Sequence, residues 1–257
     1  MTAAVKAALR RRDTVVLLAA LALLVAWELG GWDLALTRRF GSAEGFAWRN
    51  AWWAQQLLHD GGRLLAWGLL GMAVLGLWRP WLTGPTRRQR VFWLGVLLTS
   101  VVLVPAIKRL SSTSCPWELA EFGGHAAYVP HWLLGVADGG SGHCFPSGHA
   151  VSAFAFVALF FLWRPHRPRL AWALLGAVLA FGAVSGLTQL VRGAHFLSHS
   201  LWSAWLCAAI AVAARPLAPV AELGPVDAQP AWDDRSGAAS GDGQALGGVS
   251  QVADQRR

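Results

Sequence analysis

Histidines stand at the beginning of two apolar stretches of this chain. The segment 142–154, GHCFPSGHAVSAF, places His149 directly after a Pro-Ser-Gly turn, while His195 and His199 open a later stretch. Lys108 lies at the end of a third apolar stretch. An imidazole can act as a nucleophile or move a proton near neutral pH, and an ammonium group attracts an anion. These residue types are therefore suited to acid–base and nucleophilic chemistry on an anionic group.

The turn that precedes His149 is itself a candidate anion site. Ser147 and the backbone N–H groups near Gly148 lie where a helix is expected to begin, and free N–H groups with the positive end of the helix dipole favour an anion. Gly148 also permits close approach of a ligand to the backbone. The alternative is that Pro146 and Ser147 only cap a membrane helix.

The composition is that of an integral membrane protein. Of 257 residues, 55% are hydrophobic and 14% are charged, and the mean hydropathy is +0.42. The apolar residues form six long blocks, and a membrane helix needs roughly 17–25 such residues. We therefore expect an all-α, six-span transmembrane bundle. The blocks cover residues 14–32, 63–81, 91–107, 148–163, 170–191 and 196–214.

The basic residues predict the orientation of these blocks. With the N-terminus inside, 12 of the 22 Lys and Arg residues fall on the cytoplasmic side, 7 fall outside, and 3 lie in the C-terminal tail. This bias follows the positive-inside rule, so both termini are expected in the cytoplasm and the histidine-rich face outside, towards the periplasm of a bacterial inner membrane. The same topology explains the pI near 10.9 without nucleic acid as a partner.

The composition and the predicted topology divide the chain into regions. Residues 1–13 are expected to form a cytoplasmic N-terminus, and residues 14–215 the helical domain with the first block kept as an anchor. Residues 33–60 are expected to form a helical segment on the outer interface, and residues 108–148 an outer active-site loop. The tail 216–257 is rich in Gly, Ala, Asp, Gln and Ser and is expected to be disordered.

Three distant groups meet at one membrane face under this topology. Lys108, His149 and the His195/His199 pair each lie where a block reaches the outer side, so a bundle brings them to one depth. Ionisable groups near lipid are costly, which makes their gathering a functional-site hypothesis. For each residue alone, the alternative is an ordinary interface side chain.

These residues resemble the three motifs of the type 2 phosphatidic acid phosphatase (PAP2) superfamily over residues 60–214. The family pattern is Lys, six residues, Arg-Pro; then Pro-Ser-Gly-His; then Ser-Arg, five residues, His, three residues, Asp. The order and spacing here are the same. The matching positions are Lys108 with Cys115-Pro116, Pro146-Ser147-Gly148-His149, and Thr188-Gln189 with His195 and His199.

The resemblance implies roles for these residues. His195 would attack phosphorus and form a phosphohistidine, His149 would protonate the leaving oxygen and then activate water, and Lys108 would hold the phosphate. It implies a lipid phosphate or diphosphate as substrate among membrane lipids, with no cofactor or metal. A zinc site is a weaker alternative, because His195 and His199 have the i, i+4 spacing of metal ligands.

Three positions depart from the family pattern. Cys115 and Gln189 replace arginines, and His199 replaces the aspartate that orients the nucleophile, a role that a neutral imidazole can also fill. Arg192 lies three residues after Gln189 and can supply the missing guanidinium, or else anchor to headgroups. Arg109 is a similar substitute for Cys115.

The two outer cysteines have a structural interpretation as well. In an oxidising compartment Cys115 and Cys144 can form a disulfide that ties the first motif to the second, with two free thiols as the alternative. Cys-Pro-Trp at 115–117 and Arg-Gly-Ala-His-Phe at 192–196 favour a specialised branch of the family. We therefore expect a membrane phosphatase; the alternatives are a lipid phosphotransferase and a non-catalytic headgroup-binding or transport relative.

Overall fold

The described part of the protein is mainly helical, as the sequence predicted. The computed structural model describes residues 3–133 and 135–219. The longer helices are α1 (Ala3–Leu29), α3 (Gly61–Leu75), α4 (Arg87–Arg109), α5 (Gly148–Phe154), α6 (Val157–Trp163), α7 (Pro168–Val191) and α8 (Leu197–Ala214). The short elements are α2 (Trp32–Thr37), β1 (Gly41–Ser42), β2 (Gly45–Phe46), η1 (Trp53–Asp60), η2 (Pro116–Glu118), η3 (Ala120–Phe122) and η4 (Arg215–Leu217).

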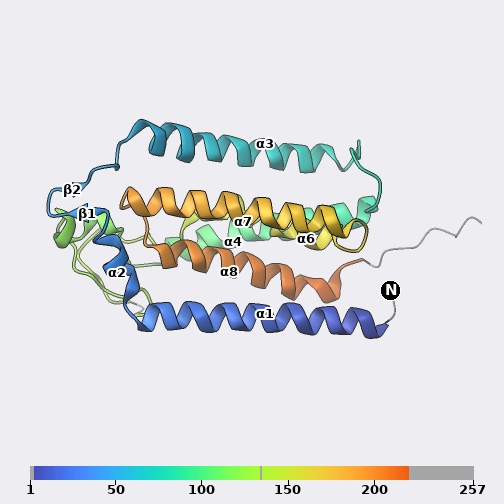
Figure 1. Cartoon of the computed structure of the whole chain (residues 1–257), viewed down its shortest axis with the longest axis horizontal. Coiled ribbons are helices and arrows are strands. Elements are labelled where there is room, and N and C mark those ends of the chain that lie inside the picture. The colour runs from blue at the N-terminus through green and yellow to red at the C-terminus, as the bar shows by residue number, and fades with distance from the viewer. Residues whose placement is uncertain (1–2, 134, 220–257) are drawn as a thin grey trace, which may run out of the picture. The chain divides into compact units, whose positions relative to one another are not determined.

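The long helices pack along a common axis (Figure 1). α8 packs against α1, α4 and α5, and α7 packs against α5 and α6. α1 begins and α8 ends at one end of this bundle, while α2 and the β1–β2 hairpin lie at the other end. The long loop between α4 and α5 lies at the hairpin end too, so the connections gather there.

Three helices of the described residues are long and apolar enough to cross a membrane. They are Arg87–Arg109, Pro168–Val191 and Leu197–Leu217, and Gly148–Trp163 forms a shorter apolar helical stretch. Six spans are thus not confirmed. α1 carries charges near both ends, α3 has 15 residues, and a turn at Ala155–Phe156 separates α5 from α6. Many large apolar side chains on the bundle surface are exposed, which suits contact with lipid.

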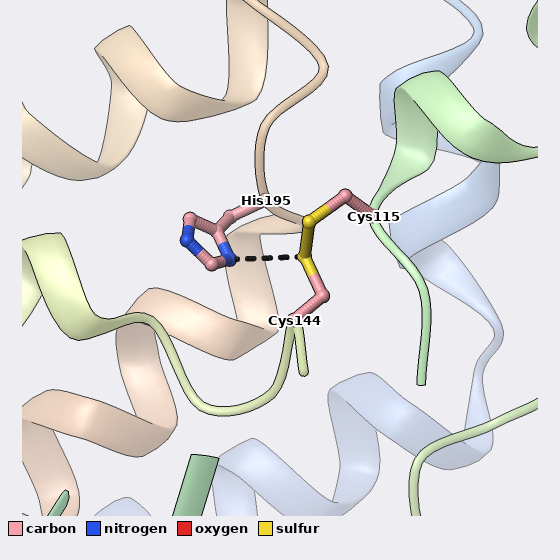
Figure 2. Close-up of side chains that lie close together, drawn as sticks. All are labelled: Cys115, Cys144 and His195. Carbon is pink, nitrogen blue, oxygen red and sulfur yellow. Dashed lines mark hydrogen bonds between the residues drawn. A yellow bond between two sulfur atoms is a disulfide. The ribbon is translucent and has the colours of Figure 1, made fainter. Parts of the chain in front are cut away.

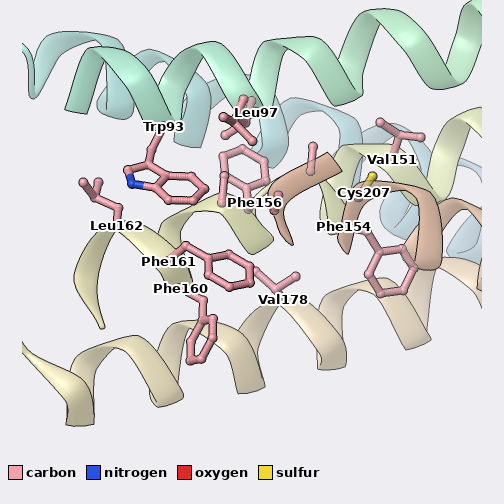
Figure 3. Packing of buried hydrophobic residues seen from close by; sticks show 14 of the residues in the cluster. Trp93, Leu97, Val151, Phe154, Phe156, Phe160, Phe161, Leu162, Val178 and Cys207 are labelled. Carbon is pink, nitrogen blue, oxygen red and sulfur yellow. The ribbon is translucent and has the colours of Figure 1, made fainter. Parts of the chain in front are cut away.

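The bundle interior is packed by aromatic and aliphatic side chains (Figure 3). Trp93 of α4 stacks on Phe161 of α6 with ring centroids 5.5 Å apart. Phe154 of α5 lies so close to α7 that a Cβ at Gly182 would stand 2.2 Å from its ring. Because interiors pack to crystal-like density, these contacts fix the position of α5, whose first turn carries His149.

Polar contacts tie the helices together at both ends of the bundle. Asp13 of α1 pairs with Arg164 at 2.9 Å and also with Arg215, which follows α8. At the other end, the Ser147 N–H donates to the His199 carbonyl at 3.0 Å. The Ser203 hydroxyl donates to the Ser147 carbonyl at 2.8 Å. The start of α5 is therefore fixed against α8.

Some predicted boundaries change. The first helix begins at Ala3, so the expected N-terminal region is largely helical, and the second long helix ends at Leu75, before the end of the predicted block. The segment 33–60 is not one helix, because it contains the rest of α2, the hairpin and the π-helix η1. Residues 1–2 and most of the predicted tail, 220–257, lie outside the described residues.

Candidate active site

A tight turn between α7 and α8 positions His195. The Ala194 and His195 N–H groups both donate to the Gln189 carbonyl, at 2.9 and 3.3 Å. Gly193 has φ +71°, and a Cβ there would lie 2.3 Å from the Phe46 ring. Only glycine fits both the backbone conformation and the space. The turn that presents His195 is therefore defined by its sequence and by the β2 residue packed on it.

The loop between α4 and α5 holds the other side of this turn. The Trp117 N–H donates to the Gly193 carbonyl at 2.9 Å, which joins the Cys-Pro-Trp segment to the Arg-Gly-Ala-His-Phe segment. Cys115 and Cys144 form a disulfide across 29 residues of sequence. Figure 2 shows this disulfide beside the His195 ring. The segments 115–117 and 192–196 are thus parts of one contact region.

The structure brings His149 and His195 together. Their ring centroids lie 5.8 Å apart, although 45 residues of chain separate them. Lys108, at the end of α4, reaches the same region: a Cβ built at Gly148 would lie 3.7 Å from Lys108 Cδ and 4.0 Å from its Nζ. Two imidazoles and an ammonium group therefore meet beside the first turn of α5.

A further histidine that the sequence reasoning gave no role lies at this site. The His59 ring packs against His149 with centroids 4.3 Å apart, and its Nδ1 is 2.8 Å from an Asp60 carboxylate oxygen. The sequence did place His59 on the outer face. His59 is followed by Asp60 and lies just before the second apolar block, and this position was the sequence feature that could have indicated a place at the site.

His199 is in a different environment from the one expected. Its ring centroid is 5.8 Å from that of His195 in a T-shaped arrangement, and its Nδ1 has no hydrogen-bond partner among the described residues. The rings of Phe145 and Phe196 each lie 5.3 Å away, and His131 lies 5.9 Å away. The hydrogen bond expected to orient His195 is thus not seen, because His199 is enclosed by aromatic rings.

The predicted phosphate-binding residues are distributed unevenly around the site. The Ser147 hydroxyl accepts from the Ala150 N–H at 3.4 Å, so Ser147 caps α5. Gln189 is buried, and its side-chain oxygen is 3.5 Å from an Arg192 nitrogen, while the Arg192 Nε donates to the Arg49 carbonyl. Arg109 is exposed at the end of α4. Arg192 is thus the arginine that lies beside Gln189.

Burial sets the protonation of the site. His195 is 2% exposed, and this desolvation, reinforced by the charge of Lys108, holds the pKa of His195 well below its ordinary value. The imidazole is therefore neutral at pH 7 and keeps a lone pair for nucleophilic attack. Burial also lowers the pKa of His131, in the loop between α4 and α5, to about 4.

Two cavities adjoin the first turn of α5. A small one of about 60 Å³ is lined by polar groups that include His59, Arg63, His149 and Gln189. A second, of about 170 Å³, runs between α3, α4 and α5 and is mostly apolar, with Trp67, Leu97 and Pro105 on its walls. Gly148 and Arg63 border both cavities. A polar pocket next to an apolar groove suits a ligand with a charged head and a hydrocarbon chain.

A cluster of possible metal ligands also occurs here. The side-chain ligand atoms of Cys115, Cys144 and His195 lie within 4.8 Å of one another. The two sulfurs are bonded to each other, however, and the thiolate is the form of cysteine that binds metals. The oxidised cluster therefore does not fit a metal ion.

A bundle of apolar helices with two histidines and a lysine gathered at one end defines a membrane protein with a polar site at that end. The sequence pattern of the PAP2 superfamily matches residues 90–221, and the chain belongs to this superfamily.

The fold resembles the crystal structure of a transmembrane PAP2 type phosphatidylglycerolphosphate phosphatase from Bacillus subtilis, with a TM-score of 0.51 and 17% sequence identity. The similarity covers 80% of this chain and 94% of that one. No curated protein sequence matches the chain.

Proposed function

We propose that the protein hydrolyses a lipid phosphate or diphosphate at the outer face of the membrane through a phosphohistidine. The observation that carries this proposal is the approach of His149 and His195 to 5.8 Å, beside Lys108. A phosphoryl group between the two rings would meet a nucleophile on one side and a proton donor on the other.

The reaction would proceed in two steps. The His195 lone pair attacks phosphorus, and the bond from phosphorus to the leaving oxygen breaks as His149 gives that oxygen a proton. The negative charge of the bound phosphate favours the protonated form of His149. His149 then takes a proton from water, which attacks the phosphohistidine and releases phosphate. Lys108, the α5 first turn at Gly148, and Arg192 with Gln189 supply positive charge and hydrogen bonds around the phosphoryl oxygens.

The apolar groove beside Gly148 supports a lipid substrate. It is bordered by α3, α4 and α5, and it meets the polar pocket at Gly148 and Arg63. A headgroup phosphate would lie beside His149, which lines the polar pocket and whose ring centroid is 5.8 Å from that of His195, while an acyl or prenyl chain follows the groove. Phosphatidylglycerol phosphate is one candidate, as the substrate in the name of the Bacillus subtilis protein. Phosphatidic acid, polyprenyl diphosphate and the phosphate of lipid A are others.

The orientation proposed from the basic residues places this site outside. The site lies at the hairpin end of the bundle, opposite the end where α1 begins and α8 ends (Figure 1). With the N-terminus in the cytoplasm, six crossings would put both chain ends inside and the site in the periplasm.

The test is phosphate release by the purified protein in detergent with EDTA present. We expect release from at least one of these lipids, loss of release in His195→Ala, and acid-labile labelling of the parent by a ³²P-lipid. Appearance of a phosphorylated lipid without free phosphate would identify the phosphotransferase instead. Binding of the lipids with neither product would identify the headgroup-binding alternative.

A further inference from the structure

The Cys115–Cys144 disulfide touches the proposed nucleophile directly (Figure 2). Cys144 Sγ lies 3.3 Å from His195 Nδ1 and 3.1 Å from the Ala194 carbonyl oxygen. We propose that the Cys144 sulfur is the positioning group of His195, and that it accepts a hydrogen bond from Nδ1–H and thereby directs the Nε2 lone pair to the phosphate. This inference rests on the proposed function.

The chemistry of a disulfide fixes the direction of this hydrogen bond. A sulfur bonded to carbon and to a second sulfur carries no hydrogen, so Cys144 can only accept. For this contact to be a hydrogen bond, the His195 ring has to hold its hydrogen on Nδ1, which leaves the lone pair on Nε2. Figure 2 shows the second ring nitrogen on the side away from the disulfide.

Burial makes a weak acceptor effective at this position. Sulfur is a poorer acceptor than oxygen, but Cys144 is fully buried and His195 is nearly so, which keeps competing water away. Backbone hydrogen bonds on either side of the disulfide also hold the sulfur in place. The Cys144 N–H donates to the Thr113 carbonyl at 2.9 Å. The Trp117 N–H donates to the carbonyl of Gly193, in the turn that carries His195. The acceptor therefore has a defined place beside the ring.

The disulfide accounts for two sequence departures at once. In the family pattern an aspartate four residues after the nucleophile would orient it, and here that residue is His199, whose Nδ1 has no partner among the described residues. An arginine position is occupied by Cys115, whose sulfur is bonded to Cys144. Cys115 stands at the arginine position and is bonded to the Cys144 sulfur. That sulfur makes the contact to the His195 ring that the aspartate, here replaced by His199, would have made.

The role in the reaction is selection of a tautomer. When Nε2 attacks phosphorus, its lone pair forms the N–P bond, the P–O bond breaks, and the leaving oxygen takes the proton of His149. The hydrogen on Nδ1 stays on the ring throughout and stays directed at sulfur. Hydrolysis returns the N–P electrons to Nε2, so the disulfide is neither reduced nor consumed.

The first test reads the tautomer without any assay of activity. The full-length protein with ¹⁵N-histidine would be studied by NMR at pH 7, and the His195 signals would be assigned by difference with His195→Asn. We expect a protonated Nδ1 and an unprotonated Nε2, and a loss of this preference in Cys115→Ala/Cys144→Ala. A parent protein with the hydrogen on Nε2 overturns the proposal, and so does an unchanged preference in the double variant.

The second test separates the acceptor from the cross-link. In Cys115→Ala/Cys207→Ala, methyl methanethiosulfonate converts the Cys144 thiol to a methyl disulfide and releases methanesulfinic acid, which restores a hydrogen-free sulfur without a cross-link. Complete modification would be checked by mass. We expect a rise of about fivefold in phosphate release, the factor for one neutral hydrogen bond of about 1 kcal/mol. No rise in the fully modified protein overturns the proposal.

Cys115→Ala/Cys144→Ala/Cys207→Ala treated in the same way is the matched control and should not respond. Failure of the proposed function would look different. If the parent protein releases no phosphate, hydrolysis is ruled out, whereas the NMR result still shows whether sulfur fixes the His195 tautomer.

Discussion

His149 and His195 face each other with ring centroids 5.8 Å apart, one at the first turn of α5 and the other in the turn before α8. The Ser147 N–H donates to the His199 carbonyl and joins the two segments that carry these rings. The arrangement allows one ring to act as nucleophile and the other as acid on a group held between them.

Replacement of His149 tests its role as the acid. General acid catalysis contributes roughly 10²- to 10⁴-fold, and it matters most when the leaving oxygen is strongly basic. We expect His149→Ala to lower kcat by about 100-fold or more on a lipid phosphate, but much less on p-nitrophenyl phosphate, whose leaving group needs no proton. The exposed His125→Ala is the control. Equal losses on both substrates would contradict the acid role.

Addition of a methyl group at Gly148 tests the phosphate position. A Cβ there would lie in ordinary contact with Lys108 Cδ at 3.7 Å, so the fold should tolerate it. The methyl group would nevertheless occupy space between the ammonium group and the α5 turn. We expect Gly148→Ala to raise KM about tenfold, a loss of about 1.4 kcal/mol of binding, with an unchanged Tm.

Gly68→Ala is the matched control, because nothing lies within 4 Å of a Cβ there. An unchanged KM in Gly148→Ala would place the phosphate elsewhere.

His59 offers a test of how His149 is held. The His59 ring packs on His149 at 4.3 Å, and aromatic pairs of this kind contribute about 1 kcal/mol. We expect His59→Asn, which removes the ring, to lower kcat about fivefold. His59→Phe keeps a ring but loses the contact with Asp60, and it should retain most of the activity. Equal losses in the two variants would mean that the imidazole itself takes part in proton transfer.

The pH dependence of kcat/KM should reflect the buried nucleophile. Burial and Lys108 lower the pKa of His195 well below its ordinary value, and only the neutral ring can attack. A lower pKa means that the ring loses its proton at a lower pH, so activity should be kept as the pH falls from 7 to 6. Half-maximal kcat/KM at or above pH 6.5 on the acid side would contradict this assignment.

The sequence by itself determined which residues could meet at one face. The apolar blocks predicted the long helices because burial of a helix in lipid requires a continuous apolar stretch, and the blocks at 91–107, 170–191 and 196–214 lie within or nearly match α4, α7 and α8. The motif spacings placed Lys108, His149 and His195 near helix ends. Apolar blocks and motif spacings are local along the chain, so the sequence shows them without knowledge of the tertiary structure.

Only the tertiary structure decided what each side chain touches. His59 joins His149, and Cys144 sulfur joins His195, through packing between segments far apart in sequence. His199 shares the spacing of an orienting residue but is enclosed by Phe145 and Phe196. Helical spacing fixes the face on which a residue lies, whereas its hydrogen-bond partner depends on which distant atoms pack against that face.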